Sequence, residues 1–178
     1  MAHDETLAQA LRAAIREVPD FPKPGIAFKD ITPVLQDPAL FARTCRALAA
    51  PWQEDGIDAV FAIESRGFLF GAPVALELGA ALVPVRKPNK LPHLRVTESY
   101  ALEYGADRLE AHRDAIQPGA RVLIVDDLLA TGGTAGAAIR LVGRLGGSLA
   151  GVAAVISLDF LPWREALGNH RVETLVSF

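Results

Sequence analysis

The stretch RVLIVDDLLATGGT, residues 121–134, indicates both the fold of the chain and where to look for its function. Its four branched apolar residues, 122–125, predict a buried strand, and two carboxylates, Asp126 and Asp127, follow directly. Carboxylates that close a buried strand cost desolvation unless they accept hydrogen bonds or meet a cation. The small and hydroxylated residues 130–134 suit an anion, because backbone N–H groups are free where a helix begins. A sugar with a diol and a phosphate would suit both parts of the stretch, the diol meeting the carboxylates and the phosphate meeting the loop.

Strand-like and helix-like patterns alternate on both sides of this stretch. Apolar runs at 59–63, 81–85 and 150–156 predict further strands, and residues 68–78 and 135–145 have the spacing of amphipathic helices. This alternation predicts an α/β fold with a central, mostly parallel sheet flanked by helices. In such sheets ligands bind at the carboxyl ends of the strands. The segments expected on that rim are 64–67, 86–90 and 126–134.

The N-terminal part of the chain has a different character. Apolar residues at helical spacing predict an amphipathic helix over 7–18. The segment DFPKPGIAFKDITPVLQDP, residues 20–38, is expected to be ordered but irregular, since each proline removes a donor and restricts the preceding residue. Asp37 as N-cap and Pro38 as first helical residue then open a helix to about Ala50.

Residues 88–107, PNKLPHLRVTESYALEYGAD, fit neither the helical nor the strand period. A long polar excursion from a compact α/β domain is more often a functional loop than spare chain. No repeat, low-complexity segment or linker divides the sequence, so residues 1–178 are expected to form a single domain.

Composition excludes several classes of protein. The chain has 178 residues, a net charge of −3 and a pI near 5.8, so it has no basic field that would attract nucleic acid or acidic lipid. Its single cysteine, Cys45, excludes an intrachain disulfide and is expected to fill the core. The N-terminus lacks the apolar centre of a signal peptide, and no apolar run approaches the roughly 18 residues of a membrane span. We therefore expect a cytoplasmic protein. The histidines show no metal-ligand spacing.

Each rim segment has a simpler explanation when it is taken alone. For the glycines of 131–134, a tight turn without a ligand is favoured, and neither a Walker loop nor a dinucleotide fingerprint is present. The pair Asp126 and Asp127 shifts that balance towards a phosphosugar, since a single capping Asp would suffice for a turn. The basic residues beyond the other two strands predict a second anionic group, although a solvated basic face would explain them by itself. These residues are Arg66, Arg86, Lys87 and Lys90.

The stretch VDDLLATGGT closely resembles the phosphoribosyl-pyrophosphate signature of the type I phosphoribosyltransferases, in the form typical of the adenine phosphoribosyltransferase family. Three further blocks are similar to that family in the same order: FPKPGIAFKDITPVLQDP, ESRGFLFG, and VRKPNKLP with ESYALEYG. The resemblance covers almost the whole chain. It implies the type I phosphoribosyltransferase fold, with a small N-terminal hood at 20–36 and a flexible catalytic loop at 91–107.

The resemblance also implies roles for individual residues. Those implied for the ribose 5-phosphate and its diol are Asp126, Asp127, Ala130, Thr131, Gly132, Gly133 and Thr134. Those implied for pyrophosphate are Ser65, Arg66, Gly67, Lys87, Lys90 and Tyr104. Those implied for adenine are Ala27, Phe28, Lys29 and Leu128. Glu103 and Arg66 are implied as catalytic, with Glu103 as the acid/base near the purine imidazole nitrogens. Members of the family often have a non-proline cis peptide in the turn at Ser65.

The reaction that the resemblance implies belongs to purine salvage: adenine and phosphoribosyl pyrophosphate give AMP and pyrophosphate. Mg²⁺ would arrive with the donor rather than at a dedicated protein site. A homodimer is implied, with no nucleic-acid or membrane partner. Three alternatives remain open: a transferase for hypoxanthine, guanine or xanthine, a regulator of this fold that binds nucleic acid, and a plain α/β interaction domain. The hood and the ALEYG block argue against the first, the charge of −3 and Glu103 against the second, and the paired aspartates against the third.

Overall fold

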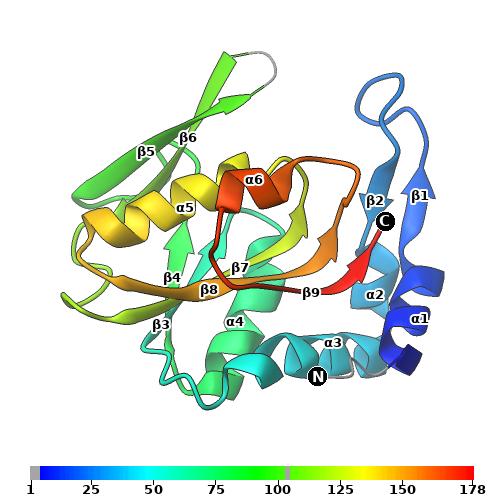
Figure 1. The fold of residues 1–178 in the computed structure, drawn as a ribbon, viewed down its shortest axis with the longest axis horizontal. Helices are drawn as coiled ribbons and strands as arrows, with labels where there is room; N and C mark the ends of the chain where they lie inside the picture. The colour runs from blue at the N-terminus through cyan, green and yellow to red at the C-terminus, as the bar shows by residue number, and fades with distance from the viewer. Residues whose placement is uncertain (1–4, 103–104) are drawn as a thin grey trace.

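A parallel five-stranded sheet forms the centre of the molecule (Figure 1). The computed structural model describes residues 5–102 and 105–178. The sheet has the order β4-β3-β7-β8-β9, and each neighbouring pair is parallel. Its strands are β3 Ala59–Ile63, β4 Ala81–Val85, β7 Arg121–Leu129, β8 Ser148–Ser157 and β9 Val172–Ser177. The predicted α/β architecture with a central parallel sheet is confirmed, and residues 172–177 close one edge of that sheet.

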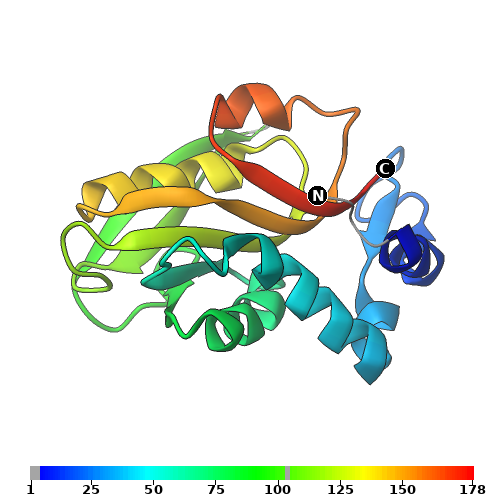
Figure 2. The ribbon, with the colours of Figure 1, turned by 60° about the horizontal axis from the view of Figure 1, so that its bottom comes forward.

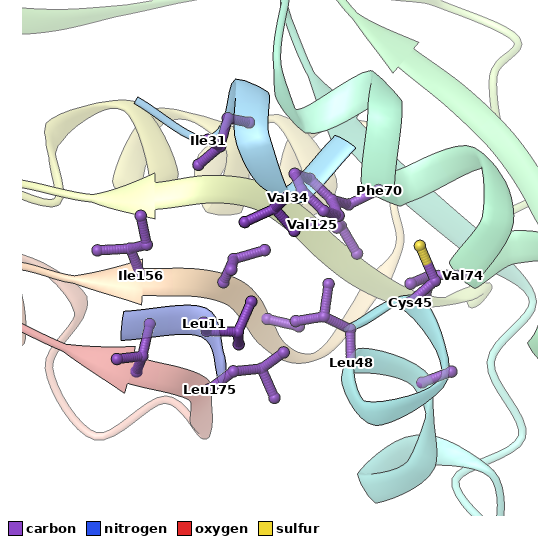
Figure 3. Close-up of a cluster of buried hydrophobic side chains, with 14 of the residues drawn as sticks. Leu11, Ile31, Val34, Cys45, Leu48, Phe70, Val74, Val125, Ile156 and Leu175 are labelled. Atoms are coloured by element: carbon purple, nitrogen blue, oxygen red, sulfur yellow. The ribbon is translucent and has the colours of Figure 1, made fainter. Parts of the chain in front are cut away.

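Helices cover both faces of the sheet because alternate residues of its strands point to opposite sides. On one face, Leu123 and Val125 of β7 pack with α1 (Glu5–Ala14), α3 (Pro38–Ala49) and α4 (Gly67–Leu78) (Figure 3). On the other face, Val122 and Ile124 pack with α5 (Gly133–Arg144). Figure 2 shows these layers from a second direction. The remaining short helices are α2 Thr32–Gln36, the 3-10 helix η1 Ala50–Trp52 and α6 Trp163–Leu167.

Cys45 lies buried in the core, as the sequence predicts. It lies on α3 and packs with Phe70 and Val74 of α4, among other buried apolar residues (Figure 3). Burial raises the pKa of its thiol to about 11, so the thiolate that a nucleophile requires is scarce at neutral pH. The cap of α3 is also as expected, since the Asp37 side chain accepts from the N–H groups of Ala39 and Leu40 at 2.9 and 3.0 Å.

The N-terminal helix is shorter than its periodicity predicts. It ends at Ala14, and the next residues form the strand β1 (Arg16–Val18). This strand pairs antiparallel with β2 (Phe28–Asp30), which lies inside the segment expected to be irregular. The prediction of helix over 15–18 is wrong because ladder pairing with a segment ten residues downstream outweighs local helical spacing. The resulting two-stranded ribbon, β1 with β2, stands beside the carboxyl ends of β8 and β9 (Figure 1).

Much of the segment 88–107 is regular rather than a loop. Strand β5 (Arg95–Leu102) pairs antiparallel with β6 (Gly105–His112), from Arg95 opposite His112 to Leu102 opposite Gly105. The expectation of irregular chain here is wrong for the strand residues. The alternation is hard to see in the sequence because the inward positions of β5 include the polar Glu98, which Arg140 and Arg144 of α5 neutralise at 3.1 and 2.8 Å.

Candidate active site

The paired carboxylates of Asp126 and Asp127 lie buried near the carboxyl end of the central strand, only 9% and 4% exposed. The strand continues through Leu129, so they lie within it and not just beyond it as the sequence suggested. Asp126 Oδ1 accepts from the backbone N–H of Asp127 at 2.8 Å. Within the described residues, Asp127 Oδ2 has no hydrogen-bond donor, although Arg66 Nε lies 3.0 Å away as an ion-pair partner. One buried oxygen is therefore free to accept a bond from a ligand hydroxyl.

Burial dominates the electrostatics of this pair. It raises the pKa of Asp126 well above the ordinary carboxyl value, and the negative charge of Asp127 raises it further. Burial also raises the pKa of Asp127, while the guanidinium of Arg66 acts in the opposite direction. Two carboxylates in a buried space favour partners that donate hydrogen bonds or carry positive charge. A sugar diol and a developing cationic centre both have that character.

The turn after β3 brings α4 against these carboxylates. The peptide bond between Glu64 and Ser65 is cis, as the resemblance implied for this turn. Gly67 begins α4 so close to β7 that a Cβ atom there would lie 2.9 Å from both Asp126 Oδ1 and the carbonyl oxygen of Val125. Glycine is the residue that permits this approach. The residues Ser65, Arg66 and Gly67 therefore lie next to the acidic pair.

A small pocket follows directly on the acidic pair. Its volume is about 80 Å³, the size of a single small group. The residues that line it are Asp126, Leu128, Leu129, Ala130, Thr131, Gly132, Gly133, Thr134 and Ala135. Gly132 has a φ of +80°, and a Cβ atom there would come within 2.8 Å of Ala166 on α6. The structure thus joins the whole predicted loop 130–134 to Asp126, at the start of the twelve-residue helix α5, where free N–H groups favour an anion.

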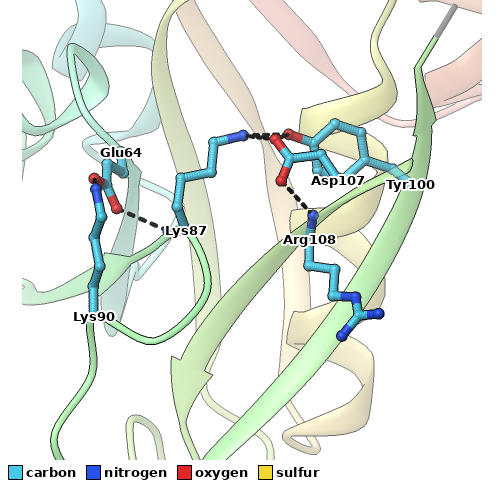
Figure 4. Close-up of polar contacts among 6 residues, drawn as sticks. All are labelled: Glu64, Lys87, Lys90, Tyr100, Asp107 and Arg108. Atoms are coloured by element: carbon cyan, nitrogen blue, oxygen red, sulfur yellow. Dashed lines mark hydrogen bonds and ion pairs between the residues drawn. The ribbon is translucent and has the colours of Figure 1, made fainter. Parts of the chain in front are cut away.

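Glu64 organises the basic residues of the neighbouring strand end (Figure 4). Its Oε2 accepts from Arg86 Nε at 3.0 Å and from the backbone N–H of Lys87 at 2.8 Å. Its Oε1 pairs with the ammonium of Lys90. Burial by itself would raise the pKa of Glu64, but the hydrogen bonds from Lys90, Lys87 and Arg86 outweigh it and lower the pKa to about 2. Glu64 therefore stays ionised and holds three basic residues in fixed positions.

The ammonium of Lys87 reaches the β5–β6 hairpin (Figure 4). It donates to Tyr100 Oη at 2.5 Å and pairs with the carboxylate of Asp107. Desolvation would lower the pKa of Lys87, but the hydrogen bonds with Asp107 and Tyr100 outweigh it and raise the pKa. Two of the three N–H donors of the ammonium are thus used within the protein. Glu103 and Tyr104, for which the sequence predicts roles, lie outside the described residues.

The ribbon of β1 and β2 presents different side chains on its two faces. Phe28 lies against Arg66, whose guanidinium carbon is 4.9 Å from the ring centroid, so this face adjoins the acidic pair. Ala27 precedes Phe28 on the same segment and is exposed. Lys29 points elsewhere: its ammonium donates to Glu17 at 2.5 Å and lies 4.2 Å from the Phe178 ring centroid. Among the residues predicted for adenine, Lys29 is therefore the one whose side chain is engaged away from the acidic pair.

Sequence reasoning assigned no role to three residues of this arrangement: Glu64, Tyr100 and Asp107. Glu64 belongs to the predicted rim segment 64–67, and as an acidic residue directly after a buried strand it carries the same signal that singles out Asp126. The roles of Tyr100 and Asp107 depend on the register of the hairpin, in which they are direct partners. Because the sequence predicts a loop here, it gives no strand pairing that would bring these two residues together.

Comparison with known proteins agrees with this geometry. Residues 34–159 match the family model described as "Phosphoribosyl transferase domain". The adenine phosphoribosyltransferase of Myxococcus xanthus is 58% identical over 175 residues, which is 98% of this chain and 95% of that protein. The chain belongs to the adenine phosphoribosyltransferase family. This confirms the resemblance seen in the sequence and the type I phosphoribosyltransferase fold.

Solved structures of this family share the whole fold. The adenine phosphoribosyltransferase of Rhodothermus marinus is 52% identical, with a TM-score of 0.94 over 98% of this chain and 100% of that one. The enzyme of Saccharomyces cerevisiae, solved with an imino-altritol bisphosphate and adenine, is 42% identical, with a TM-score of 0.90 over 96% and 99% of the two chains. The family's fold therefore includes the ribbon of β1 and β2, the central sheet and the β5–β6 hairpin of this chain.

Proposed function

We propose that this chain transfers the phosphoribosyl group of phosphoribosyl pyrophosphate to adenine, giving AMP and pyrophosphate in purine salvage. The observation that carries the proposal is the buried pair Asp126 and Asp127 directly beside the 130–134 pocket, with Arg66 in contact with the pair. One ligand with a phosphate, a diol and a second anionic group matches these three features. The family's own name supplies adenine as the acceptor.

The donor sugar would lie between the loop and the acidic pair. The N–H groups and hydroxyls of Thr131 to Thr134 would bind the 5-phosphate. Asp126 and Asp127 would accept hydrogen bonds from the 2- and 3-hydroxyls. As the bond from the anomeric carbon to pyrophosphate breaks, positive charge grows on the sugar, and these carboxylates stabilise it more than they stabilise the ground state.

The leaving group would be held by the turn and the adjacent strand end. Ser65 and Gly67 would offer groups near the start of α4, and the side chains of Arg66, Lys87 and Lys90 would offer positive charge. Glu64 prevents the basic side chains from repelling one another, because it already pairs with Arg86 and Lys90. This supports the assignment of the β4 end to pyrophosphate.

The acceptor base would lie under the hood ribbon. Phe28 is suited to stack on a purine, and the backbone at Ala27 and Lys29 is suited to read its polar edge. Leu128 would add an apolar contact to the base, since it directly follows the acidic pair that would hold the sugar. Glu103 would exchange the proton at the purine imidazole nitrogens, with Tyr104 beside it, and closure of residues 91–107 would exclude water that would otherwise hydrolyse the donor.

We propose further that the donor is used as its Mg²⁺ complex. Phosphate oxygens are hard ligands of the kind that Mg²⁺ prefers, and among residues 5–102 and 105–178 no cluster of three metal-ligating side chains occurs. Asp127 Oδ2, which among the described residues has the ion pair with Arg66 but no hydrogen-bond donor, fits a further neighbour that brings positive charge. When bound, Mg²⁺ would neutralise charge on the departing pyrophosphate. The ion would thus come with the substrate.

A homodimer in the cytoplasm completes the proposal. Leu76 on α4 is 84% exposed, and Leu69 on α4 and Leu82 on the edge strand β4 are exposed as well. Exposed leucines gathered on a helix and the edge strand it packs against favour contact with a second copy. Analytical ultracentrifugation of the wild type and of Leu76→Glu tests this, with a dimer expected to weaken in the variant.

Within the described residues, no helix has the length and apolar character to span a bilayer.

The experiment for the activity follows both products. Purified chain, adenine, donor and Mg²⁺ are expected to yield AMP and pyrophosphate in equal amounts by chromatography. Glu103→Ala is expected to lose turnover while donor binding, measured by calorimetry, largely survives. AMP formation at the wild-type rate in that variant would remove Glu103 from the chemistry.

A further inference from the structure

The ammonium of Lys29 is buried although the strand that carries it belongs to a small ribbon. Lys29 is only 9% exposed, whereas its hydrogen-bond partner Glu17 is largely exposed. Glu17 and Lys29 are direct partners in the register of β1 with β2. Their ion pair therefore stays inside the ribbon and does not connect it to the rest of the molecule.

The aromatic ring of Phe178 supplies that connection. The Lys29 ammonium lies 4.2 Å from its centroid, and the guanidinium carbon of Arg12 on α1 lies 5.2 Å from the same centroid. Both distances are within the range of a cation–π interaction. One ring thus contacts a cation from the ribbon and a cation from α1.

The backbone of Phe178, which directly follows β9, is hydrogen-bonded to the neighbouring strand end. Its N–H donates to the carbonyl oxygen of Ser157 at 2.9 Å, and its carbonyl oxygen accepts from the N–H of Asp159 at 2.9 Å. Figures 1 and 2 both show this end of β9 beside β2. The backbone that carries the ring is therefore held at the carboxyl end of β8.

Side chains on the two faces of β2 contact different parts of the molecule. Phe28 contacts Arg66 near the acidic pair, and Lys29, one residue on, contacts Phe178 behind the ribbon. Successive residues of a strand point to opposite faces. Phe28 is therefore held from the active-site side by Arg66, and its strand is held from behind by Phe178.

We propose that Phe178 is a positioning residue for the acceptor base: by holding Lys29 it fixes the segment Ala27–Lys29 over the adenine site. Phe178 does not touch the substrate, and it acts through the ribbon alone. This inference rests on the proposed function for the identity of the base. It assigns a role in adenine binding, but none in donor binding, to a residue outside the signature blocks.

Steady-state kinetics with both substrates tests the role of Phe178. Phe178→Leu keeps apolar bulk but removes the π face, and we expect its KM for adenine to rise roughly three- to tenfold, as the loss of one cation–π contact allows. Its KM for the donor should stay at the wild-type value. Phe178→Tyr keeps the ring and should restore the adenine KM. Phe160→Ala removes a nearby aromatic residue that is 72% exposed, and it should leave both constants unchanged.

A proportional rise of both KM values in Phe178→Leu, or an unchanged adenine KM, would overturn the proposal. Hydrogen exchange at the amides of 16–18 and 28–30 gives an independent reading, with faster exchange expected in Phe178→Leu than in wild type and Phe178→Tyr. If the wild type fails to convert adenine, the proposed function fails, while the exchange measurement still decides whether Phe178 holds the ribbon. Equal exchange in all three proteins would contradict that attachment.

Discussion

Nε of Arg66 lies 3.0 Å from Oδ2 of Asp127, which joins the residue proposed for pyrophosphate to one proposed for ribose. The contact crosses from the turn after β3 to the central strand β7. In the proposed reaction it would place the charges for the two ends of the breaking bond side by side: acidic groups at the sugar, which becomes positive, and a cation at the leaving group, which becomes negative. Preorganised charge of this kind contributes most to catalysis because it does not have to reorganise during the reaction.

Asp126→Asn is expected to lower turnover and to raise stability. The variant loses a carboxylate that would stabilise the sugar cation, but it removes a buried charge whose pKa burial and Asp127 raise. We expect a gain of about 1–2 kcal/mol in the free energy of unfolding near pH 7, or roughly 2–8 °C in Tm. A raised carboxyl pKa means that wild-type stability falls as pH rises through it, so the gain should shrink in acid.

Thermal unfolding of Asp126→Asn and of Asp58→Asn checks this. Asp58 directly precedes β3, at the amino ends of the strands, and accepts from the backbone N–H of Arg121 at 2.7 Å, so its variant should lose stability and keep activity. A destabilised Asp126→Asn would show that the pair is not strained by its own charge.

Glu64→Gln is expected to weaken both stability and donor binding. The pKa of Glu64 falls from 4.5 to about 2 on folding, so its stabilising effect is complete above about pH 4.5 and is lost as pH falls towards 2. We expect a loss of roughly 1–3 kcal/mol at pH 7, allowing for partial solvent screening. The donor KM should also rise because Arg86 and Lys90 lose their common partner. Urea unfolding at several pH values should show the difference between the two proteins narrowing in acid, and a pH-independent difference would contradict the account.

Asp107→Asn is expected to lower the pH at which pyrophosphate binding begins to weaken in alkaline solution. Asp107 and Tyr100 together raise the pKa of Lys87 despite its partial burial. Without the Asp107 charge, the ammonium should lose its proton at lower pH, so affinity for pyrophosphate should begin to fall at lower pH than in wild type. Calorimetric titrations between about pH 7 and 10 measure this. Glu98→Gln is the control, because Glu98 lies on the same hairpin but pairs with Arg140 and Arg144 and not with Lys87. In this variant, pyrophosphate affinity should fall at the same pH as in the wild type.

The N-cap glycine of α5 and a glycine inside that helix should respond in opposite ways to alanine. Gly132 has a positive φ, and its Cβ would meet Ala166 at 2.8 Å and the carbonyl oxygen of Trp163 at 3.0 Å. Gly132→Ala should therefore cost about 1–3 kcal/mol and impair phosphate binding. Gly143 lies inside the helix with nothing within 4 Å of a Cβ, so Gly143→Ala should gain about 0.5–1 kcal/mol. Chemical denaturation compares them, and equal effects would contradict the proposed constraint at Gly132.

Apolar periodicity was enough to predict four of the five strands of the central sheet and its two main crossover helices, but not the edge strand β9. Runs such as 59–63 and 122–125 are buried on both faces, and no other element type suits them. The rim also followed, because the carboxyl ends of parallel strands share one edge. This is why Arg66 and Asp127, far apart in the chain, could be expected close together.

The remaining features depend on pairing across the chain. The alternation of β5 is hard to see because one of its inward residues is the acidic Glu98, which Arg140 and Arg144 of α5 neutralise. Helical spacing through 15–18 gave way to the ladder with 28–30. The direction of the Lys29 side chain was set by Glu17 and Phe178, neither of which local sequence could identify. Side-chain direction in a short ribbon depends on partners that only the fold brings together.

The purine acceptor is the central claim, and a substrate panel tests it most directly. Turnover with phosphoribosyl pyrophosphate and Mg²⁺ should be measured separately for adenine, hypoxanthine, guanine and xanthine, with kcat/KM as the readout. The account predicts that adenine exceeds each of the others by at least about a hundredfold, since a site that pairs with a polar edge rejects bases whose edge differs. A kcat/KM for hypoxanthine or guanine equal to or above that for adenine would contradict it.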